Sequence, residues 1–377
     1  MDRMEGNPYA DLPARAFWKT GVVQEDPGAI GGIYNKKFAI PPHASLAAAG
    51  SCFAQHISHR LRKNGYNVLD LEPAPPDLPE VLHQRFGFST YSARHGNIYT
   101  ARQLLQLLQE ALGERSPSHY IWKKKDKFVD ALRPSVEPEG LDSAEEVMEH
   151  RRHHLVCVRQ LFEQLDVFFF TFGMTEMWEH RESGTVYPTA PGTTAGTFDP
   201  QIFAFRNATH NEVREDVNHF QSLLRGLRGG RPFQLLLTVS PVPLTATASG
   251  QHVLVANAYS KATLRSVAGQ LSMEHDHIDY FPSHEIVNHP KLHGTAFADN
   301  LRSVREEMVE AVMNYFFVAH DLHGPEKILN GHDHAEAPQQ PSSPCQEVDR
   351  AKPEDDQHRE AEIACEEMIL ESFAPPG

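Results

Sequence analysis

The sequence predicts a three-layer α/β/α sandwich with a mainly parallel sheet. Two apolar runs, residues 165–172 and 233–239, have the length and composition of strands buried on both faces. Helical patterns precede and follow each run, so strands and helices alternate along the chain. This alternation is typical of a parallel sheet covered by helices on both faces.

The first strand-helix pair is expected near residue 45. Residues 45–49 are small and apolar and end at Gly50, where a helical pattern begins that continues to Gly65. Residues 66–71 then read as extended. We interpret this as strand, turn, helix and strand, which is the opening unit of a parallel sheet.

Two capping signatures predict the next helices. Thr100 and Gln103 have capping-box spacing before a helical segment at 104–112, and Ser143 and Glu146 repeat that spacing before a helix that reaches residue 164. The buried strand at 165–172 follows directly.

The rest of the predicted domain continues the alternation. A helix at 211–228 precedes the strand at 233–239, which is closed by prolines. Residues 255–271 are expected to be helical and 277–281 extended. Residues 301–317 carry apolar side chains at helical spacing, which predicts the last helix of the domain.

The composition divides the chain into three parts. Residues 1–36 form an N-terminal extension, 37–322 the α/β domain, and 323–377 an acidic tail rich in Pro, Ser and Glu. With almost no aromatic residues, the tail cannot offset its ordering entropy, and we expect it to be disordered. A weak apolar stripe favours a short helix around 359–373.

Charge and hydropathy exclude several classes of protein. The net charge is −15, whereas a nucleic-acid-binding surface needs a basic footprint. The lysines at 123–125 are interpreted as a solvated hairpin turn. No segment approaches the length of a membrane span, and no secretory signal is visible, so we expect a cytoplasmic protein. The four cysteines show no paired spacing that would predict disulfides.

Cys52 is the residue whose position suggests chemistry. It follows the first predicted strand and enters a helix, and ligands of open α/β sheets bind at the carboxyl ends of strands. A thiol at a helix N-terminus is stabilised as thiolate by the helix dipole. The alternative is a small buried cysteine with a purely structural role.

The same residues resemble a known family. Gly50-Ser51-Cys52-Phe53-Ala54 is the five-residue signature of the GSCFA family, and the resemblance covers roughly 37–317. Further segments resemble motifs of that family: Gly96-Asn97-Ile98-Tyr99-Thr100-Ala101, Phe172-Gly173-Met174-Thr175-Glu176, Thr238-Val239-Ser240-Pro241-Val242-Pro243-Leu244 and Tyr280-Phe281-Pro282-Ser283.

The GSCFA family is in turn similar to the SGNH/GDSL hydrolases, which implies an SGNH hydrolase-like, flavodoxin-like fold. In those enzymes a Gly-Asp-Ser motif supplies the nucleophile. The resemblance places Cys52 at the serine and Ser51 at the aspartate. Cys52 is therefore the expected nucleophile, and Ser51 is the alternative shifted by one residue.

The resemblance also implies donors for an oxyanion. Gly96 corresponds to the glycine of the second SGNH block, and Asn97 beside it is a further donor. The third block corresponds to Gly173 through Glu176, with Thr175 at the asparagine position. Glu176 is also expected at the rim of the site. Such donors stabilise the charge of a tetrahedral intermediate.

The base is the open question. Asp299 matches the aspartate of the hydrolase Asp-x-x-His motif, but no histidine follows at the matching position. The aspartate is also a candidate cap for the last helix. His252, in the loop after the 233–239 strand, is the leading candidate base and His284 the second. His289, His293 and a polar rim of Asn257, Tyr259 and Lys261 are further candidates.

The resemblance implies an esterase or an O-acyltransferase that acts on an acyl ester, with a carbohydrate as the natural substrate, through a covalent acyl-enzyme on Cys52. The alternative is a non-catalytic carbohydrate-binding or assembly protein that retains the cleft. No nucleotide loop or metal-ligand spacing is present, so no cofactor and no metal are expected. The sequence does not identify a protein partner for the tail.

Overall fold

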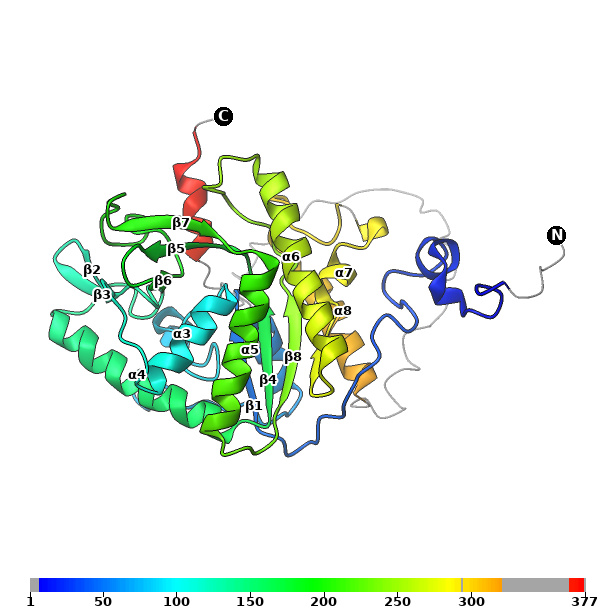
Figure 1. Ribbon diagram of the computed structural model, residues 1–377, viewed down its shortest axis with the longest axis horizontal. Helices are drawn as coiled ribbons and strands as arrows, with labels where there is room; N and C mark the ends of the chain where they lie inside the picture. Colours follow the sequence, from blue (N-terminus) through cyan, green and yellow to red (C-terminus); the bar gives the residue numbers. More distant parts are fainter. Residues whose placement is uncertain (1–6, 293, 321–365, 376–377) are drawn as a thin grey trace, which may run out of the picture.

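The computed structural model describes residues 7–292, 294–320 and 366–375. At its centre is a four-stranded parallel sheet in the order β1-β4-β8-β9 (Figure 1). Its strands are β1 (Leu46–Gly50), β4 (Val167–Phe172), β8 (Gln234–Val239) and β9 (Ile278–Tyr280). The predicted strands at 45–49, 165–172, 233–239 and 277–281 are confirmed, as is the predicted fold class.

The helices cover both faces of this sheet. Alternate side chains of β4 explain why: Phe168 and Phe170 pack into one apolar core, and Phe169 packs into another. The first core includes residues of α3 (Ala101–Ala111), α4 (Ala144–Gln164), α5 (His210–Leu227) and α6 (Val253–Glu274). The second includes residues of α1 (Phe53–Lys63), α7 (Ser283–Val287) and α8 (Glu306–Ala319).

The predicted capping residues begin their helices. The Thr100 hydroxyl accepts from the Gln103 amide, and the Gln103 side chain accepts from the Thr100 amide at 3.1 Å, which completes a capping box at α3. Ser143 caps α4 by accepting from the amide of Glu146. These bonds satisfy N–H groups that the first helical turn leaves without a partner.

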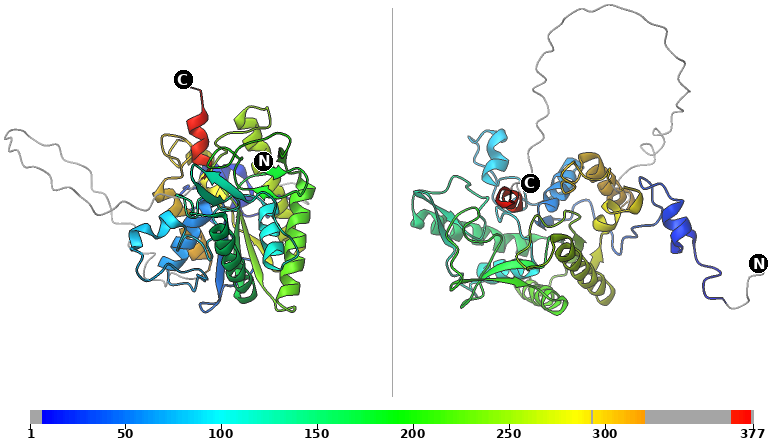
Figure 2. Two further views of the ribbon diagram at one scale, coloured as in Figure 1. Left: turned by 90° about the vertical axis from the view of Figure 1, so that its left-hand side faces the viewer. Right: turned by 90° about the horizontal axis from the view of Figure 1, so that it is seen from above.

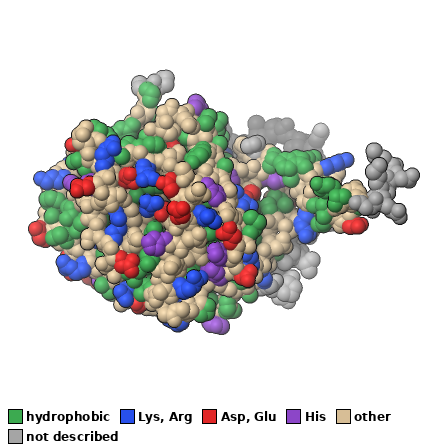
Figure 3. All heavy atoms as spheres, viewed as in Figure 1, with side chains coloured by type: hydrophobic (Ala, Val, Ile, Leu, Met, Phe, Trp, Pro, Cys, Tyr) green, Lys and Arg blue, Asp and Glu red, His purple; other side chains and the backbone are tan. Residues whose placement is uncertain are grey.

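Two small antiparallel sheets lie outside the parallel one. The lysine run forms the turn of the hairpin between β2 (Ile121–Lys124) and β3 (Lys127–Asp130), as predicted. On the face shown in Figure 3, acidic and basic side chains lie interspersed. The second sheet, absent from our prediction, has the order β6-β5-β7 and consists of β5 (Glu176–His180), β6 (Val186–Tyr187) and β7 (Phe203–Asn207).

Three predictions are wrong in detail. Residues 66–71 form only an isolated bridge, between Val68 and Leu46, rather than a strand. The last helix begins at Glu306 and not near residue 301, because Leu301 has a positive φ of 51° that ends any regular helix there. Asp299 is therefore not its cap, a position that Arg305 holds.

The remaining described helices are short. They are η1 (Ala14–Ala16), η2 (Lys19–Val23), α2 (Glu80–His83), η3 (Gln84–Phe86), η4 (Pro290–Leu292) and η5 (Glu366–Phe373). The last lies within the predicted tail and inside the short helix expected around 359–373, while residues 321–365 and 376–377 lie outside the described residues. No helix in the described part of the chain combines the length and apolar character of a membrane span.

Candidate functional site

Cys52 lies where the central strand β1 passes into α1. Gly50 makes this junction possible, because its φ is 146° and a Cβ there would lie 2.5 Å from the Thr171 carbonyl oxygen. Cys52 is the N-cap residue of α1, is 6% exposed, and is not part of a disulfide. The thiol therefore lies, as predicted, at the end of a strand and at the N-terminus of a helix.

Ser51 is buried beside it. Its Oγ is shielded from solvent and makes no hydrogen bond with any described residue. A Cβ on Gly173 would lie 3.1 Å from the Cβ of Ser51, so the loop after β4 approaches this residue closely. The Ser51 hydroxyl is thus available inside the protein, although no base is bonded to it.

Asn97 is held in one orientation beside these residues. Its side-chain oxygen accepts from the Tyr91 hydroxyl at 2.6 Å and from Gln55 Nε2 at 3.0 Å. The same hydroxyl lies 3.1 Å from the Ser51 carbonyl, which connects Asn97 to the Cys52 turn. Because the oxygen is engaged, the Asn97 NH₂ group is the end that faces a ligand. It donates to the carboxylate of Glu366.

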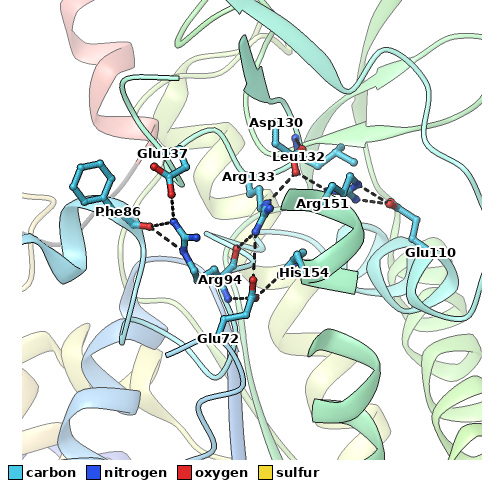
Figure 4. Close-up of polar contacts among 10 residues, drawn as sticks. All are labelled: Glu72, Phe86, Arg94, Glu110, Asp130, Leu132, Arg133, Glu137, Arg151 and His154. Carbon is cyan, nitrogen blue, oxygen red and sulfur yellow. Dashed lines mark hydrogen bonds and ion pairs between the residues drawn. The ribbon is translucent and has the colours of Figure 1, made fainter. Parts of the chain in front are cut away.

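A network of buried charges positions the loop that carries Asn97 (Figure 4). Glu72 accepts from the Arg94 amide at 2.7 Å, and Arg133 donates to the Arg94 carbonyl at 3.0 Å. Arg133 also pairs with Asp130 at 2.9 Å. Both backbone groups of a residue three positions before Asn97 are therefore fixed by buried ions.

Lys261 is buried, although the sequence suggested only a residue at the rim of the site. It lies on α6, is 4% exposed, and donates from Nζ to the Gly173 carbonyl at 2.7 Å. Burial lowers the pKa of Lys261 from its usual 10.5 to about 8, although the charges of Glu367 and Cys52 oppose the shift; Arg302 lowers it further. The pKa of the amine therefore lies close to the ordinary range of a thiol, and the charge of Cys52 acts on it.

Arg302 adds a second buried cation. Its Nε donates to the Pro243 carbonyl at 3.1 Å, and its NH2 atom lies 2.9 Å from a carboxylate oxygen of Glu367. Glu366 lies next to it, where the Tyr99 hydroxyl donates to its carboxylate at 2.6 Å. Two acidic side chains of η5 therefore meet the donors and cations of the site.

The predicted histidines differ in where they lie. His252 is exposed and caps α6, accepting from the Leu254 amide at 3.2 Å, so it lies outside this group of residues. His284 lies closer, since burial and the charge of Lys261 lower its pKa. It bonds to the Ser240 backbone, and Asn288 Nδ2 lies 3.3 Å from its Nδ1. His284 therefore lies near Lys261 and stays a candidate for proton transfer.

The structure also shows where the other candidate side chains lie. Asp299 is fully exposed beside Arg305, and His289 is buried with burial lowering its pKa, while His293 lies outside the described residues. Asn257 Oδ1 accepts from the Leu244 amide, and the Tyr259 hydroxyl lies 3.4 Å from the Ala208 carbonyl. Both of these contacts are with backbone groups of other segments.

Some of the predicted oxyanion donors are bonded to other parts of the fold, and one faces a carboxylate of η5. The Gly173 amide donates to the Tyr99 carbonyl at 2.9 Å, and the Thr175 hydroxyl donates to Asn207 at 2.6 Å, so both are committed to the fold. Gly96 occupies a turn with a φ of 69° beside Arg133. Of the predicted set, Asn97 is the one whose side-chain donor faces a carboxylate.

A groove of about 590 Å³ lies next to these residues. Trp178, Phe198 and Phe205 form an aromatic cluster along it, with Trp178 5.3 Å from Phe198 and 5.7 Å from Phe205 between ring centroids. Glu176 lines it and accepts from the Thr247 hydroxyl at 2.6 Å, and burial raises its pKa. Of the residues expected at the rim, Glu176 lines this groove.

One group of described side chains has ligand atoms close enough for a metal. Glu72, His153 and Cys157 offer atoms within 4.8 Å of one another. Glu72 already accepts from His154 at 2.6 Å and from the Arg94 amide. Because its carboxylate serves the buried network, we assign no metal to this group.

The comparisons with known proteins agree with the motif reading. No curated protein matches the chain. The model of the GSCFA family matches residues 45–316, which include β1 with the Cys52 turn, Lys261 and Arg302 but not η5. That match covers most of the chain and the whole parallel sheet, and the protein belongs to the GSCFA family.

Proposed function

We propose that the protein transfers acyl groups through a covalent thioester on Cys52. The observation that carries this proposal is Lys261, a buried lysine with a pKa of about 8 that interacts electrostatically with the Cys52 thiol. Buried lysines with lowered pKa values are typical of proton-exchanging sites. The thiol lies at the carboxyl end of a parallel strand, where α/β proteins bind their ligands.

The proton balance favours Lys261 over the predicted histidines. A free cysteine thiol has a pKa of about 8.5, close to that of this amine, so transfer between the two costs little. The thiol proton passes to the neutral amine as sulfur attacks the ester carbonyl. The resulting ammonium then protonates the leaving alkoxide, and the thioester remains on Cys52.

The donors around Glu366 suit the intermediate of this reaction. Asn97 Nδ2 and the Tyr99 hydroxyl already hold a carboxylate oxygen, which carries negative charge like the oxygen of a tetrahedral intermediate. We propose the Cys52 amide as the third donor. In this proposal Asn97 and Tyr99 replace the Gly173 and Thr175 donors that the sequence predicted.

The similarity of the Cys52 turn to the Gly-Asp-Ser turn of SGNH hydrolases supports the same reaction class. Arg302 lies three residues after Asp299, at the position where those enzymes have their histidine. We propose that a lysine from a different helix, α6, takes over the proton transfer. Water as the acceptor makes the protein an esterase, and a sugar hydroxyl in the aromatic groove makes it an O-acyltransferase.

A second candidate function is a binding protein without chemistry. A binding function is favoured by the carboxylate of Glu366, which already accepts hydrogen bonds from Asn97 and Tyr99 in the site. This reading predicts an inert Cys52, whereas acyl transfer needs a reactive one. The two candidates therefore differ in the behaviour of one thiol.

Alkylation by iodoacetamide between pH 6 and pH 9, read at each cysteine by peptide mass spectrometry, tests the proposal. Cys157 is the internal control, because it is buried and burial raises its pKa to about 11. We expect Cys52 to react at least ten times faster than Cys157 at pH 7, and Lys261→Met to move its profile to higher pH. The measurement is repeated with Glu366→Ala/Glu367→Ala, which opens the site. A Cys52 as slow as Cys157 in that variant contradicts acyl transfer.

A further inference from the structure

The C-terminal segment η5 docks against the candidate site from a distant part of the chain. Figure 2 shows it, in red, among the elements of the folded domain and away from the N-terminal segment. It follows α8 by 45 residues that lie outside the described residues, and the hydrogen bond between Asn97 and Glu366 spans 269 positions in sequence. Its position is therefore set by the contacts that it makes, which are of two kinds.

The first contacts are polar and involve consecutive glutamates. Glu366 is 6% exposed and accepts from Asn97 and Tyr99. Glu367 pairs with Arg302 at 2.9 Å and acts electrostatically on Lys261. Both glutamates are thus matched to cations or donors inside the protein, which is the arrangement that buried carboxylates need.

The second contacts are apolar. Leu370 and Phe373 line the same groove as Trp178 and Phe198. A short helix therefore meets the polar part of the site through the acidic residues at its start and forms one wall of the aromatic groove, where Phe373 is 60% exposed. This is the helix-in-groove mode of peptide recognition, with charged anchors at one end.

One atom of the docked segment has no hydrogen-bond partner among the described residues. The second carboxylate oxygen of Glu366, Oε1, is buried and makes no hydrogen bond with any described residue. A buried acceptor without a partner costs about 1–3 kcal/mol, which reduces what the other contacts contribute. The segment is held by hydrogen bonds and an ion pair, but one of its buried carboxylate oxygens has no hydrogen-bond partner among the described residues.

We propose that the cleft is a recognition site for an acidic, amphipathic peptide segment, and that its resident ligand is Glu366–Phe373 of the same chain. The segment occupies the side chains of Asn97, Tyr99 and Arg302, so a substrate that binds them has to displace it. Without these glutamates the cleft would hold two buried cations, Lys261 and Arg302, and the donors Asn97 and Tyr99. That set attracts another carboxylate-bearing ligand in its place.

A labelled peptide tests this inference without reference to catalysis. The probe is a fluorescein-labelled synthetic peptide with the sequence of residues 366–375, and its binding to the full-length chain is followed by fluorescence anisotropy. We expect the Glu366→Ala/Glu367→Ala chain to bind the peptide at least ten times more tightly than the unmodified chain, because its own segment no longer competes. Glu371→Ala is the matched control. Glu371 lies in the same helix at the edge of the groove, is exposed, and makes no side-chain hydrogen bond or ion pair with described residues, so this variant should bind like the unmodified chain.

A second peptide with both glutamates replaced by glutamine tests the anchors. It should bind the double variant at least ten times more weakly than the native peptide, since charged hydrogen bonds are lost. Equal binding of the two peptides, equal affinity of the unmodified and double-variant chains, or no binding to either chain would each overturn the proposal. Because the readout is binding, failure here leaves the acyl-transfer proposal standing, and an unreactive Cys52 leaves this one standing.

Discussion

Two clusters of buried charge lie in this domain, and they are completed in different ways. The network around Arg133 closes on itself (Figure 4). Arg133, in the loop after β3, pairs with Glu72 and with Asp130 of β3, and Arg151 of α4 pairs with Asp130 and with Glu110 of α3. The cluster around Lys261 is completed by glutamates of a segment far away in sequence. The first cluster has the features of a structural element, and the second those of a binding site.

The comparison teaches that burial of charge alone does not identify a functional site. Both clusters perturb the pKa values of their members, and both are shielded from water. They differ in whether the balancing charges come from the packed body of the domain or from a segment that can leave. Their responses to substitution should therefore be opposite, with stability affected at one and activity at the other.

The largest effect is expected at Lys261. Lys261→Met removes the proposed proton acceptor, and hydrolysis of p-nitrophenyl acetate should fall by about 10²–10⁴-fold, which is typical of a lost general base. The free energy of unfolding should stay the same or rise, because a buried cation is removed. Steady-state kinetics and urea unfolding of the same preparation check both expectations.

Lys261→Arg is the matched control for charge, because arginine stays protonated and cannot exchange a proton. It should be as inactive as the methionine variant. Activity close to that of the unmodified chain would show that positive charge alone is sufficient, and that Lys261 transfers no proton.

The next effect is on stability, at Arg133. Arg133→Met leaves Asp130 and Glu72 buried without their common cation, and unfolding should become easier by about 3–5 kcal/mol. Urea denaturation measures this. Arg159→Met, which breaks an exposed pair with Glu163, should change stability by about 0.5 kcal/mol or less. Equal effects of both variants would mean that the network contributes no more than a surface ion pair.

A smaller effect is expected from pH. Burial lowers the pKa of His154 from 6.5 to about 4, and the side chain stays neutral beside Glu72. Between these values the unfolded chain binds a proton that the folded chain does not, so stability falls as the pH falls below 6.5. The loss should reach about 2 kcal/mol between pH 6.5 and pH 5.

Urea denaturation at a series of pH values measures this slope. His154→Gln keeps a side-chain N–H donor for Glu72 but cannot titrate, so it should reduce the slope in this range by the contribution of one histidine. His56 and His95, whose pKa values burial also lowers to about 4, supply the rest. An unchanged slope in the variant would assign the pH dependence to other groups.

Much of the fold could be predicted because its signals are local. Continuous apolar runs marked β4 and β8, and capping residues marked the starts of α3 and α4. The sheet of β5, β6 and β7 was missed because its strands have at most five residues, and some of its side chains are only partly buried. Such strands lack the long apolar run that identifies a central strand.

The site could be predicted only in part, because its members meet through tertiary contacts. The strand-to-helix turn placed Cys52 correctly. His252 was preferred as base because it follows β8 in sequence, but the intervening loop carries it to the surface. Lys261 looked like a rim residue, since sequence gives no sign that a lysine on α6 is buried, and the glutamates of η5 lay in a segment expected to be disordered.

The most direct test of the central claim is the intact mass of the protein after incubation with p-nitrophenyl acetate. It is measured for the unmodified chain, Cys52→Ala and Ser51→Ala, each also with Glu366→Ala/Glu367→Ala so that η5 cannot block the reagent. The account predicts a single acetyl adduct that is lost in Cys52→Ala and kept in Ser51→Ala. An adduct that persists without Cys52, or that disappears without Ser51, would contradict it.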